Sequence, residues 1–312
     1  MSFPVLGQNM QFMDAEGKNP VSFATVAFGN GWGSHADSEG KFQFSQKSYP
    51  DVDTLYISAL GYKDITIAVS EIKELYFLEQ EIDRLDEIII KALPKGKFKK
   101  YDFKPISHAE YHNSWMQTVE SEIAVLINKP SEKAAQLATL YLPVNVKENV
   151  DGKEIKIRKF STMMRIKFYE NESGKPGREI HHGNIVFIIN ETHTKEVFEL
   201  NLLNHVIFIP ENGLYVSIQV LGPTDDNGNF IQTRTYNEFE TRRGIERVAI
   251  SFRPLLPLTN QIAGDKTYVR RVFLADKEWN YFNLNYNPES KLLVKGFNNY
   301  GMGARLHIYE EK

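Results

Sequence analysis

The chain has no cysteine among its 312 residues. Without thiols it cannot form disulfides, use a thiolate nucleophile or bind zinc through cysteine ligands. No apolar run approaches the ~20 residues that a membrane-spanning helix needs. Charge of neither sign dominates, because the net charge is −3 and the pI is near 6.3. The chain as a whole therefore has no electrostatic preference for nucleic acid.

Common catalytic motifs are also missing. There is no glycine-rich phosphate loop, no G-x-S-x-G elbow and no dinucleotide fingerprint. His108, Glu110 and His112 lack the His-x-x-Glu spacing of a zinc peptidase. Asp276 and Glu278 lie two residues apart, a spacing that any strand produces. We predict no catalytic residues, no cofactor and a non-enzymatic role, with a carboxylate-dependent hydrolase as the open alternative.

Aromatic residues are abundant, with 20 Phe, 15 Tyr and 3 Trp. Such side chains favour strands, since they pack well on a pleated surface. Short extended runs alternate with turn residues every 8–12 positions, which is typical of a β-sandwich or barrel. In the first part of the chain the expected strands are residues 21–28, 41–44, 54–60, 65–69, 74–78 and 85–90.

A larger β domain is expected over residues 113–312. The expected strands include residues 123–127, 137–146, 164–169, 185–189, 206–209, 214–221, 247–252, 267–273, 292–294 and 304–309. About ten strands with few amphipathic helical stretches favour a jelly-roll-like double sheet. The fold class is therefore predicted to be all-β, with a β-sandwich at residues 8–92 and a larger jelly-roll-like sandwich behind it.

Residues 93–112 separate these two regions. Lysines alternate there with Pro, Gly, Tyr and Phe, which predicts a basic inter-domain linker. A basic run with aromatics also suits a polyanion or a membrane surface, and that alternative stays open.

The N-terminus suggests export. Val5, Gly7 and Gln8 resemble the end of a signal peptide, with small or β-branched residues before the cleavage point. We interpret residues 1–7 as the remnant of such a signal. An ordinary edge strand or a cloning scar is the alternative.

The first region resembles the carboxypeptidase-regulatory-like module, a transthyretin-type domain of exported Bacteroidetes-type proteins. The resemblance depends on residues 19–26 (NPVSFATV), 37–42 (DSEGKF), 55–63 (LYISALGYK) and 85–90 (LDEIII). It implies a Greek-key, prealbumin-like sandwich without any catalytic group of its own.

The second region is similar to a β domain fused behind this module in the same bacteria. The similar segments are residues 121–127 (SEIAVLI), 165–170 (RIKFYE), 174–177 (GKPG) and 213–221 (GLYVSIQVL). Together the two resemblances imply an exported protein, periplasmic, outer-membrane-associated or extracellular. Its partner is expected to be a protein or a glycan of the cell envelope.

Exposed aromatics are the predicted ligand-binding residues, because flat rings stack on sugars. The candidates are Trp32 in a glycine-rich loop, Trp279 with Tyr281, and Tyr300 between two glycines. They make a carbohydrate-binding protein the alternative function. The same residue types also occur in cores and interfaces, so that interpretation stays open for each ring.

A weak metal candidate lies at Asp225, Asp226 and Asn227. Hard oxygen ligands followed by a glycine suit a calcium loop. However, Tyr236 occupies the twelfth position, where an EF-hand needs a glutamate. We favour an acidic hairpin turn without a metal.

Overall fold

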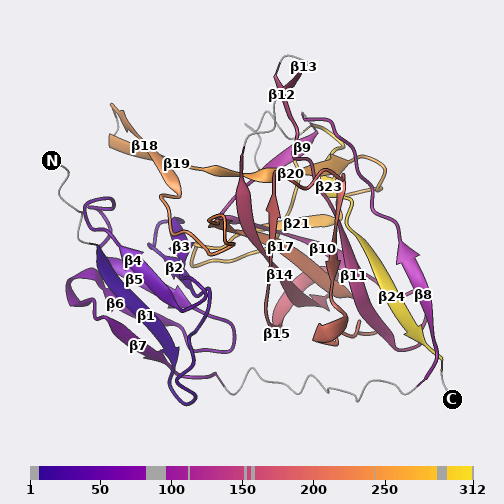
Figure 1. Cartoon of the computed structure of the whole chain (residues 1–312), viewed down its shortest axis with the longest axis horizontal. Coiled ribbons are helices and arrows are strands. Elements are labelled where there is room, and N and C mark those ends of the chain that lie inside the picture. Colours follow the sequence, from indigo (N-terminus) through magenta and orange to yellow (C-terminus); the bar gives the residue numbers. More distant parts are fainter. Residues whose placement is uncertain are drawn as a thin grey trace.

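The computed structural model describes residues 7–81, 96–111, 113–150, 153–155, 159–242, 244–286 and 294–310. In this part of the chain there is no α-helix, and the regular structure consists of strands with two short 3-10 helices. The predicted all-β fold class is confirmed. Figure 1 shows a smaller domain at the left, in indigo and purple, beside a larger domain that contains the rest of the described chain.

The smaller domain is a sandwich of two sheets. Its elements are β1 (Gln8–Asp14), β2 (Thr25–Ala27), β3 (Gly33–His35), β4 (Lys41–Phe44), β5 (Thr54–Ser58), β6 (Ile65–Ala68), η1 (Val69–Glu71) and β7 (Leu75–Leu78). One sheet has the order β4-β1-β7 and the other the order β3-β2-β5-β6. Phe12 and Phe42 from the first sheet share a buried core with Leu55 and Ile57 from the second.

Strand β4 illustrates how the sequence produces this domain. Its residues alternate between exposed and buried, so that Phe42 and Phe44 enter the core. The preceding turn is held by Asp37, whose carboxylate accepts the amides of Glu39 and Lys41 at 2.9 and 2.7 Å. Gly40 has a φ of +69°, and a Cβ there would lie 2.4 Å from the Phe12 carbonyl oxygen. Only glycine fits this corner.

Two expectations for this domain need correction. The strand expected over residues 21–28 shortens to β2, because Phe23 adopts a φ of +55° and its amide bonds instead to the Asp37 carbonyl. The segment expected to be only a loop after residue 28 contains β3, which pairs with β2. The expected strand 85–90, like most of the proposed signal remnant, lies outside the described residues.

The larger domain is also built from stacked sheets. Its elements are β8 (Phe98–Phe103), β9 (Ser114–Thr118), β10 (Ser121–Ile127), β11 (Ala135–Pro143), β12 (Glu148–Val150), β13 (Lys153–Ile155), β14 (Ser161–Glu172), β15 (Lys175–Asn190), β16 (Val197–Asn201), η3 (Leu203–His205), β17 (Leu214–Pro223), β18 (Tyr236–Thr241), β19 (Gly244–Ala249), β20 (Ser251–Thr259), β21 (Thr267–Arg271), β22 (Asn280–Tyr281), β23 (Asn299–Tyr300) and β24 (Gly303–Tyr309).

The main sheet of this domain has the order β15-β14-β17-β10-β21-β22, and a second sheet has the order β16-β11-β24-β8. Ile166 and Ile218 from the main sheet share one buried cluster with Leu140 and Leu306 from the second. The domain is therefore a sandwich around its own hydrophobic core. β9, β20 and β23 form a further three-stranded sheet.

Three segments of the larger domain differ from expectation. Residues 98–103, expected in the basic linker, form β8 and pair with β24 at the edge of the second sheet. The strand expected over residues 206–209 is absent, because Val206 is left-handed after η3 and only Phe208 makes an isolated bridge, to Gln136. Residues 292–293 of the expected strand 292–294 lie outside the described part.

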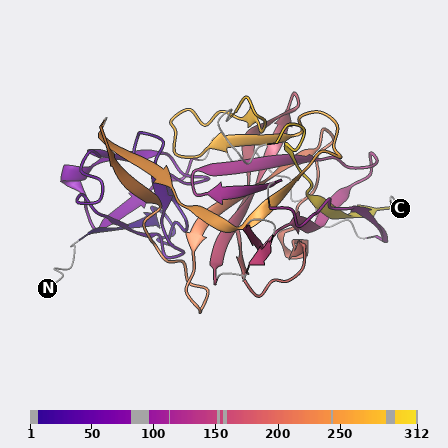
Figure 2. The same ribbon diagram turned by 90° about the horizontal axis from the view of Figure 1, so that it is seen from above.

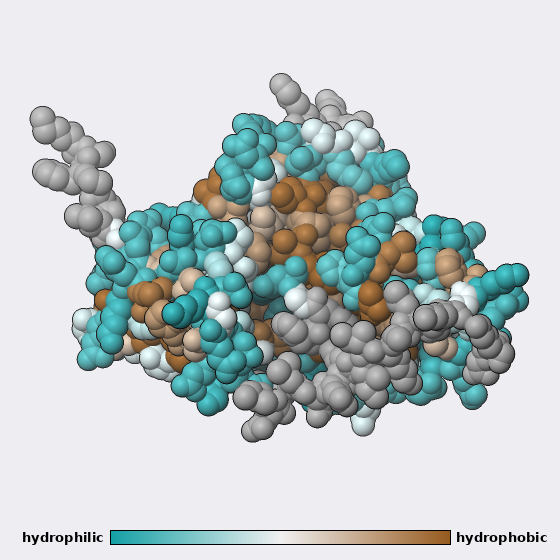
Figure 3. All heavy atoms as spheres, turned by 60° about the horizontal axis from the view of Figure 1, so that its bottom comes forward, coloured by the Kyte–Doolittle hydropathy of each residue, from teal (hydrophilic) through white to brown (hydrophobic). Residues whose placement is uncertain are grey.

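The two domains are docked through several contacts. Figure 2 shows the orange β18–β19 hairpin of the larger domain running along the smaller one. Arg247 of β19 binds Asp51 through two hydrogen bonds of 2.9 and 2.7 Å. Gln232 forms two hydrogen bonds with the backbone of Gln43, at 2.8 and 2.6 Å. Seen from below, hydrophobic residues gather in the middle of the molecule and hydrophilic residues border them (Figure 3).

Candidate functional site

A cavity of about 620 Å³ lies between the two domains. Residues 20–23 and 58–62 of the smaller domain form one wall, and residues 165–169 and 177–180 of β14 and β15 form the opposite one. This volume falls within the range of small-molecule sites in proteins. Because both domains line it, the cavity depends on how they are docked.

The wall on the larger domain is an outward face of the main sheet, opposite the face that packs on the core. Residues at i, i+2 and i+4 of a strand share one face. Cross-strand pairing places Arg165 beside Gln219, and Glu122 beside both Gln219 and Arg270. The polar and charged residues of this face, hereafter the charged face, are Glu122, Arg165, Lys167, Tyr169, Ser217, Gln219 and Arg270.

Glu122 is the centre of the charged face and is completely buried. One carboxylate oxygen accepts hydrogen bonds from the hydroxyls of Tyr169 and Ser217, at 2.6 and 2.5 Å. The other accepts Nε of Arg270 at 2.9 Å. Burial disfavours the ionised carboxylate, but Arg270, Lys167 and the two hydroxyls outweigh it and lower the pKa of Glu122 to about 2. Glu122 is thus a fixed anion rather than a proton donor.

Lys167 and Glu179 form a second ion pair at the cavity wall, with Nζ 2.9 Å from Oε1 and 3.1 Å from Oε2. Both side chains are mostly buried, at 17% and 18% exposure. Burial lowers the pKa of Lys167, and Glu179 acts in the opposite direction.

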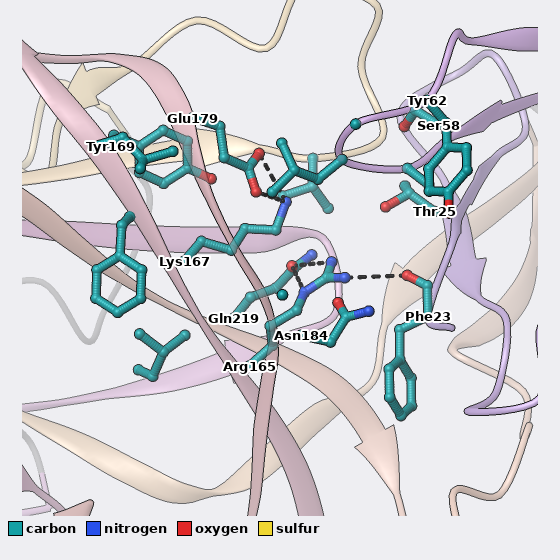
Figure 4. Close-up of a pocket in the computed structure, with 18 of the residues that line it drawn as sticks. Phe23, Thr25, Ser58, Tyr62, Arg165, Lys167, Tyr169, Glu179, Asn184 and Gln219 are labelled. Atoms are coloured by element: carbon teal, nitrogen blue, oxygen red, sulfur yellow. Dashed lines mark hydrogen bonds and ion pairs between the residues drawn. The ribbon is translucent and has the colours of Figure 1, made fainter. Parts of the chain in front are cut away.

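Arg165 differs from the other cations of the charged face because its hydrogen-bond partners are neutral. Its Nε and Nη2 donate to the Gln219 side-chain oxygen at 3.2 and 2.7 Å. Its Nη1 donates to the Phe23 carbonyl of the smaller domain at 3.1 Å. Arg165 is only 5% exposed, and Figure 4 shows its guanidinium between Gln219 and Phe23. It contacts no carboxylate among the residues that the structure describes.

Gln219 continues this network into the smaller domain. Its side-chain nitrogen lies 3.4 Å from Nε2 of His35, which is fully buried. Burial lowers the pKa of His35 well below its usual value, and Arg165 and Lys167 lower it further. The neutral imidazole therefore accepts the amide proton of Gln219, and the chain His35–Gln219–Arg165 connects the two domains.

The wall on the smaller domain carries hydroxyl groups. Thr25 and Ser58 are paired across β2 and β5, and Figure 4 places them with Tyr62 opposite Arg165 and Lys167. Ser58 Oγ lies 3.2 Å from Nζ of Lys277, another residue of the cavity wall. The cavity therefore combines cations on one side with hydroxyls on the other.

These residues were absent from the sequence-based prediction of the site. A usable signal exists in β14, where Arg165, Lys167 and Tyr169 alternate with the core residues Ile166 and Phe168. Two cations at alternate positions of a long strand indicate a solvated or ligand-facing side. The partners on β10, β17 and β21 are not predictable in this way, because their pairing needs the sheet order.

The predicted stacking residue Trp32 is an interface residue. The guanidinium of Arg247 lies 4.6 Å from its ring centroid, and the ring of Tyr236 lies at 6.1 Å. Trp32 also packs on the core of the smaller domain. Its faces are therefore engaged by side chains of both domains.

Of the other predicted aromatics, Trp279 and Tyr281 pack against tyrosines of the main sheet, and Tyr300 lies in the core. Trp279 packs edge-on against Tyr169 at 5.3 Å, with Arg270 at 4.6 Å over its ring. Tyr281 is 44% exposed and lies 4.7 Å from Tyr268. Tyr300 is fully buried, and its hydroxyl donates to the Pro143 carbonyl at 2.8 Å. Tyr300 is therefore a core residue, which corrects its assignment as a stacking residue.

The acidic segment 225–227 forms a turn. Asp225 accepts the amides of Asn227 and Asn229 at 2.9 and 2.8 Å, and Asp226 pairs with Lys159 at 2.7 Å. The carboxylate of Asp225 is thus occupied within its own turn. Across the described ranges, no three His, Asp or Glu side chains lie together as metal ligands.

Residues 11–90 match the CarboxypepD_reg-like domain. The match covers the smaller domain and agrees with the resemblance found in its turns and strands. It does not extend to the larger domain, which contributes the charged face. No curated protein matches the chain.

A solved structure of the cysteine protease and lectin-like domains of Cwp84, a surface layer associated protein of Clostridium difficile, is similar with a TM-score of 0.36 and 10% identity. The alignment covers 88% of this chain and 45% of that one, so this chain spans less than half of that structure. At this level the likeness implies neither a shared fold nor a shared activity. Within the described residues, no helix has the length and hydropathy needed to cross a membrane.

Proposed function

We propose that this protein is a non-enzymatic binding protein of the cell envelope that holds a small polar ligand in the cavity between its two domains. The observation that carries the proposal is the cavity itself, with buried ionised groups on one wall and hydroxyls on the other. A small number of precisely placed polar groups around a cavity is the usual means of orienting a ligand. The smaller domain would form one wall of the binding site rather than act as a separate appendage.

The state of the buried carboxylate supports binding over catalysis. A general acid or base works best when its pKa lies near the working pH. Glu122 has a pKa of about 2 and is saturated by Arg270, Tyr169 and Ser217. Such a group orients its neighbours and does not exchange protons during turnover.

Export to the periplasm or cell surface belongs to the same proposal. It is supported by the resemblance of residues 5–8 to a signal-peptide end and by the carboxypeptidase-regulatory-like resemblance. A Bacteroidetes-type origin and a jelly-roll topology for the larger domain are further parts of it. Fractionation of cells that express the full-length precursor tests the location, and recovery in the cytosol would contradict export.

The cavity is tested by blocking it. Ser58→Trp places an indole into the cavity wall, while Thr66→Trp adds the same group to an exposed position of β6 outside the cavity. We expect at least one compound in a library of small polar metabolites to raise the melting temperature of the wild type and of Thr66→Trp. The same compound should not affect Ser58→Trp. An unchanged response in Ser58→Trp, or no response to any compound, would contradict the proposal.

Carbohydrate binding through aromatics is the second candidate. The exposed Tyr281 ring favours it, because it continues a line of rings through Tyr268 and Tyr215 with spacings of 4.7 and 5.6 Å. A glycan panel read by thermal shift tests this idea with Tyr281→Ala. A glycan response that Tyr281→Ala leaves intact would remove this candidate.

A further inference from the structure

We infer that the ligand of the inter-domain cavity carries a carboxylate, and that Arg165 is the group that receives it. This inference rests on the proposed binding function and specifies its ligand class as a small hydroxylated organic acid, of the sugar-acid kind. Its basis is the balance of charge around the cavity.

Positive charge exceeds negative charge in the cavity wall. The charged residues of the wall are the cations Arg165, Lys167, Arg178, Arg270 and Lys277 and the anions Asp64 and Glu179. Two more carboxylates outside that lining neutralise part of the excess, because Glu122 binds Arg270 and Glu170 binds Arg178. Each of these two carboxylates is bound to a cation other than Arg165.

The excess charge belongs to Arg165. Lys167 is paired with Glu179, whereas Lys277 bonds to the neutral Ser58 hydroxyl but is exposed, so water screens its charge. Arg165 is the cation whose hydrogen bonds go to an amide oxygen and a backbone carbonyl. Glu179 and Glu122 act on the charge of Arg165 without a hydrogen bond to it. Burying a guanidinium without a hydrogen-bonded carboxylate is costly, and a carboxylate from a ligand would lower that cost.

The geometry of Arg165 suits a carboxylate. A guanidinium has five N–H donors, and Arg165 uses its Nε, one Nη1 and one Nη2 hydrogen for Gln219 and Phe23. One hydrogen on each terminal nitrogen stays available. A donor on each of two neighbouring nitrogens can bind one oxygen each of a carboxylate.

The opposite wall indicates the rest of the ligand. Thr25 and Ser58 present neighbouring hydroxyls across β2 and β5, facing Arg165 and Lys167 in Figure 4. The hydroxyl of Ser58 can donate a proton because it accepts one hydrogen bond from Lys277. Hydroxyl groups on the ligand would complete these bonds, so a hydroxy acid fits better than an apolar acid.

The test compares acids with their neutral partners. Galacturonate, glucuronate and gluconate are titrated by calorimetry beside galactose, glucose and sorbitol at constant ionic strength. We expect each acid that binds to have a dissociation constant roughly 10- to 100-fold lower than that of its neutral counterpart. This is the range of a hydrogen bond between charged groups. Arg165→Met should abolish this difference in affinity. Arg165→Lys should retain part of the difference, because lysine keeps the charge but cannot form two hydrogen bonds to one carboxylate from a guanidinium.

Arg165 also contacts the smaller domain, so its variants need a companion. Lys277 is suitable because its hydrogen bond to that domain is a single exposed one, to Ser58 Oγ at 3.2 Å. Lys277→Met removes an exposed cation of the cavity wall and should lower acid affinity several-fold without affecting neutral compounds. Lys63→Met removes one positive charge outside the cavity, where Lys63 pairs with Glu79, and should have no effect. Acid binding that is equal in Lys277→Met, Arg165→Lys and Lys63→Met would overturn the inference.

The two proposals fail in different ways. Neutral compounds that bind as tightly as their acids, and are blocked by Ser58→Trp, would refute the carboxylate inference and leave the binding function in place. Absence of any response from acids and neutral compounds alike would refute both.

Discussion

The backbone amide of Gly33 donates a hydrogen bond to the hydroxyl oxygen of Tyr236 at 2.8 Å, although the two residues are 203 positions apart in the chain. The same hydroxyl lies 3.3 Å from the Gly33 carbonyl oxygen, to which it can donate in return. Tyr236 belongs to β18 of the larger domain and is fully buried, and its burial raises its pKa. The domain interface therefore contains a buried, hydrogen-bonded contact between residues distant in sequence.

Gly33→Ala should lower the stability of the protein, because the added methyl group has no room at the domain interface. A Cβ at Gly33 would lie 2.5 Å from Phe273 Cδ1 and 2.5 Å from the Val26 carbonyl oxygen. Overpacking of this kind costs about 1–3 kcal/mol. We expect urea unfolding to show a loss of that size, whereas Gly96→Ala, where the nearest atom is 3.4 Å away, should change stability little. Equal stabilities of the two variants would contradict the tight contact.

Arg247 should couple energetically to Asp51. Its side chain is 1% exposed, it binds Asp51 and Glu238, and it stacks on Trp32. Asp51 is 51% exposed, so water screens its charge and weakens the pair. A double-mutant cycle with Arg247→Met and Asp51→Asn should give a coupling energy of roughly 0.5–1 kcal/mol. Additive effects would mean that the salt bridge contributes nothing to docking.

Acidification should weaken the fold through His35. The pKa of its buried imidazole lies well below the ordinary value of 6.5. As the pH falls below 6.5, the unfolded chain binds a proton that the folded chain does not, so stability falls with falling pH. We expect a slope of up to about 1.4 kcal/mol per pH unit between pH 6 and 5, and a smaller slope for His35→Gln. The same slope in both proteins would exclude His35 as its source.

Tyr300→Phe should destabilise the larger domain without affecting ligand binding. The hydroxyl is buried and bonds to the Pro143 carbonyl, so its removal leaves a buried acceptor unsatisfied. A loss of about 1–2 kcal/mol is expected in denaturant unfolding. Tyr101→Phe, at a ring that is 43% exposed, is the matched control. A comparable loss in the control would assign the effect to something other than burial.

Calcium should not change the melting temperature of the protein. The oxygens of Asp225 accept hydrogen bonds from Asn227 and Asn229, so a metal would have to displace them. We expect millimolar calcium or a chelator to move the melting temperature by less than about 1 °C. A rise of several degrees with calcium that disappears in Asp225→Asn would show that the turn binds metal after all.

Much of the fold could be predicted from local patterns. Alternation in residues 41–44 and the Asp37–Gly40 turn predict a hairpin corner, since both signals depend only on neighbours in the chain. The limits of β2 and the existence of β3 could not be predicted. They depend on the left-handed conformation of Phe23 and on pairing partners distant in sequence.

The sequence predicts the candidate site less well than it predicts the fold. Single aromatic residues were expected to mark it, yet the structure uses Trp32 in the domain interface and Tyr300 in the core. Burial of a ring depends on what packs over it, and this information is absent from the local sequence.

The sequence by itself determined an all-β chain, the carboxypeptidase-regulatory-like character of its first region, and the exclusion of thiol and disulfide chemistry. The fold class follows from period and turn residues, and the exclusion follows from composition. The character of the first region follows from the resemblance of its sequence segments to a known family. All of these are local properties. Only the tertiary structure decided that Glu122, Arg165, Gln219 and Arg270 share one face of a sheet and that the smaller domain closes a cavity over it. The reason is physical: strand order and domain docking join residues far apart in the chain, and the charge balance exists only after they meet.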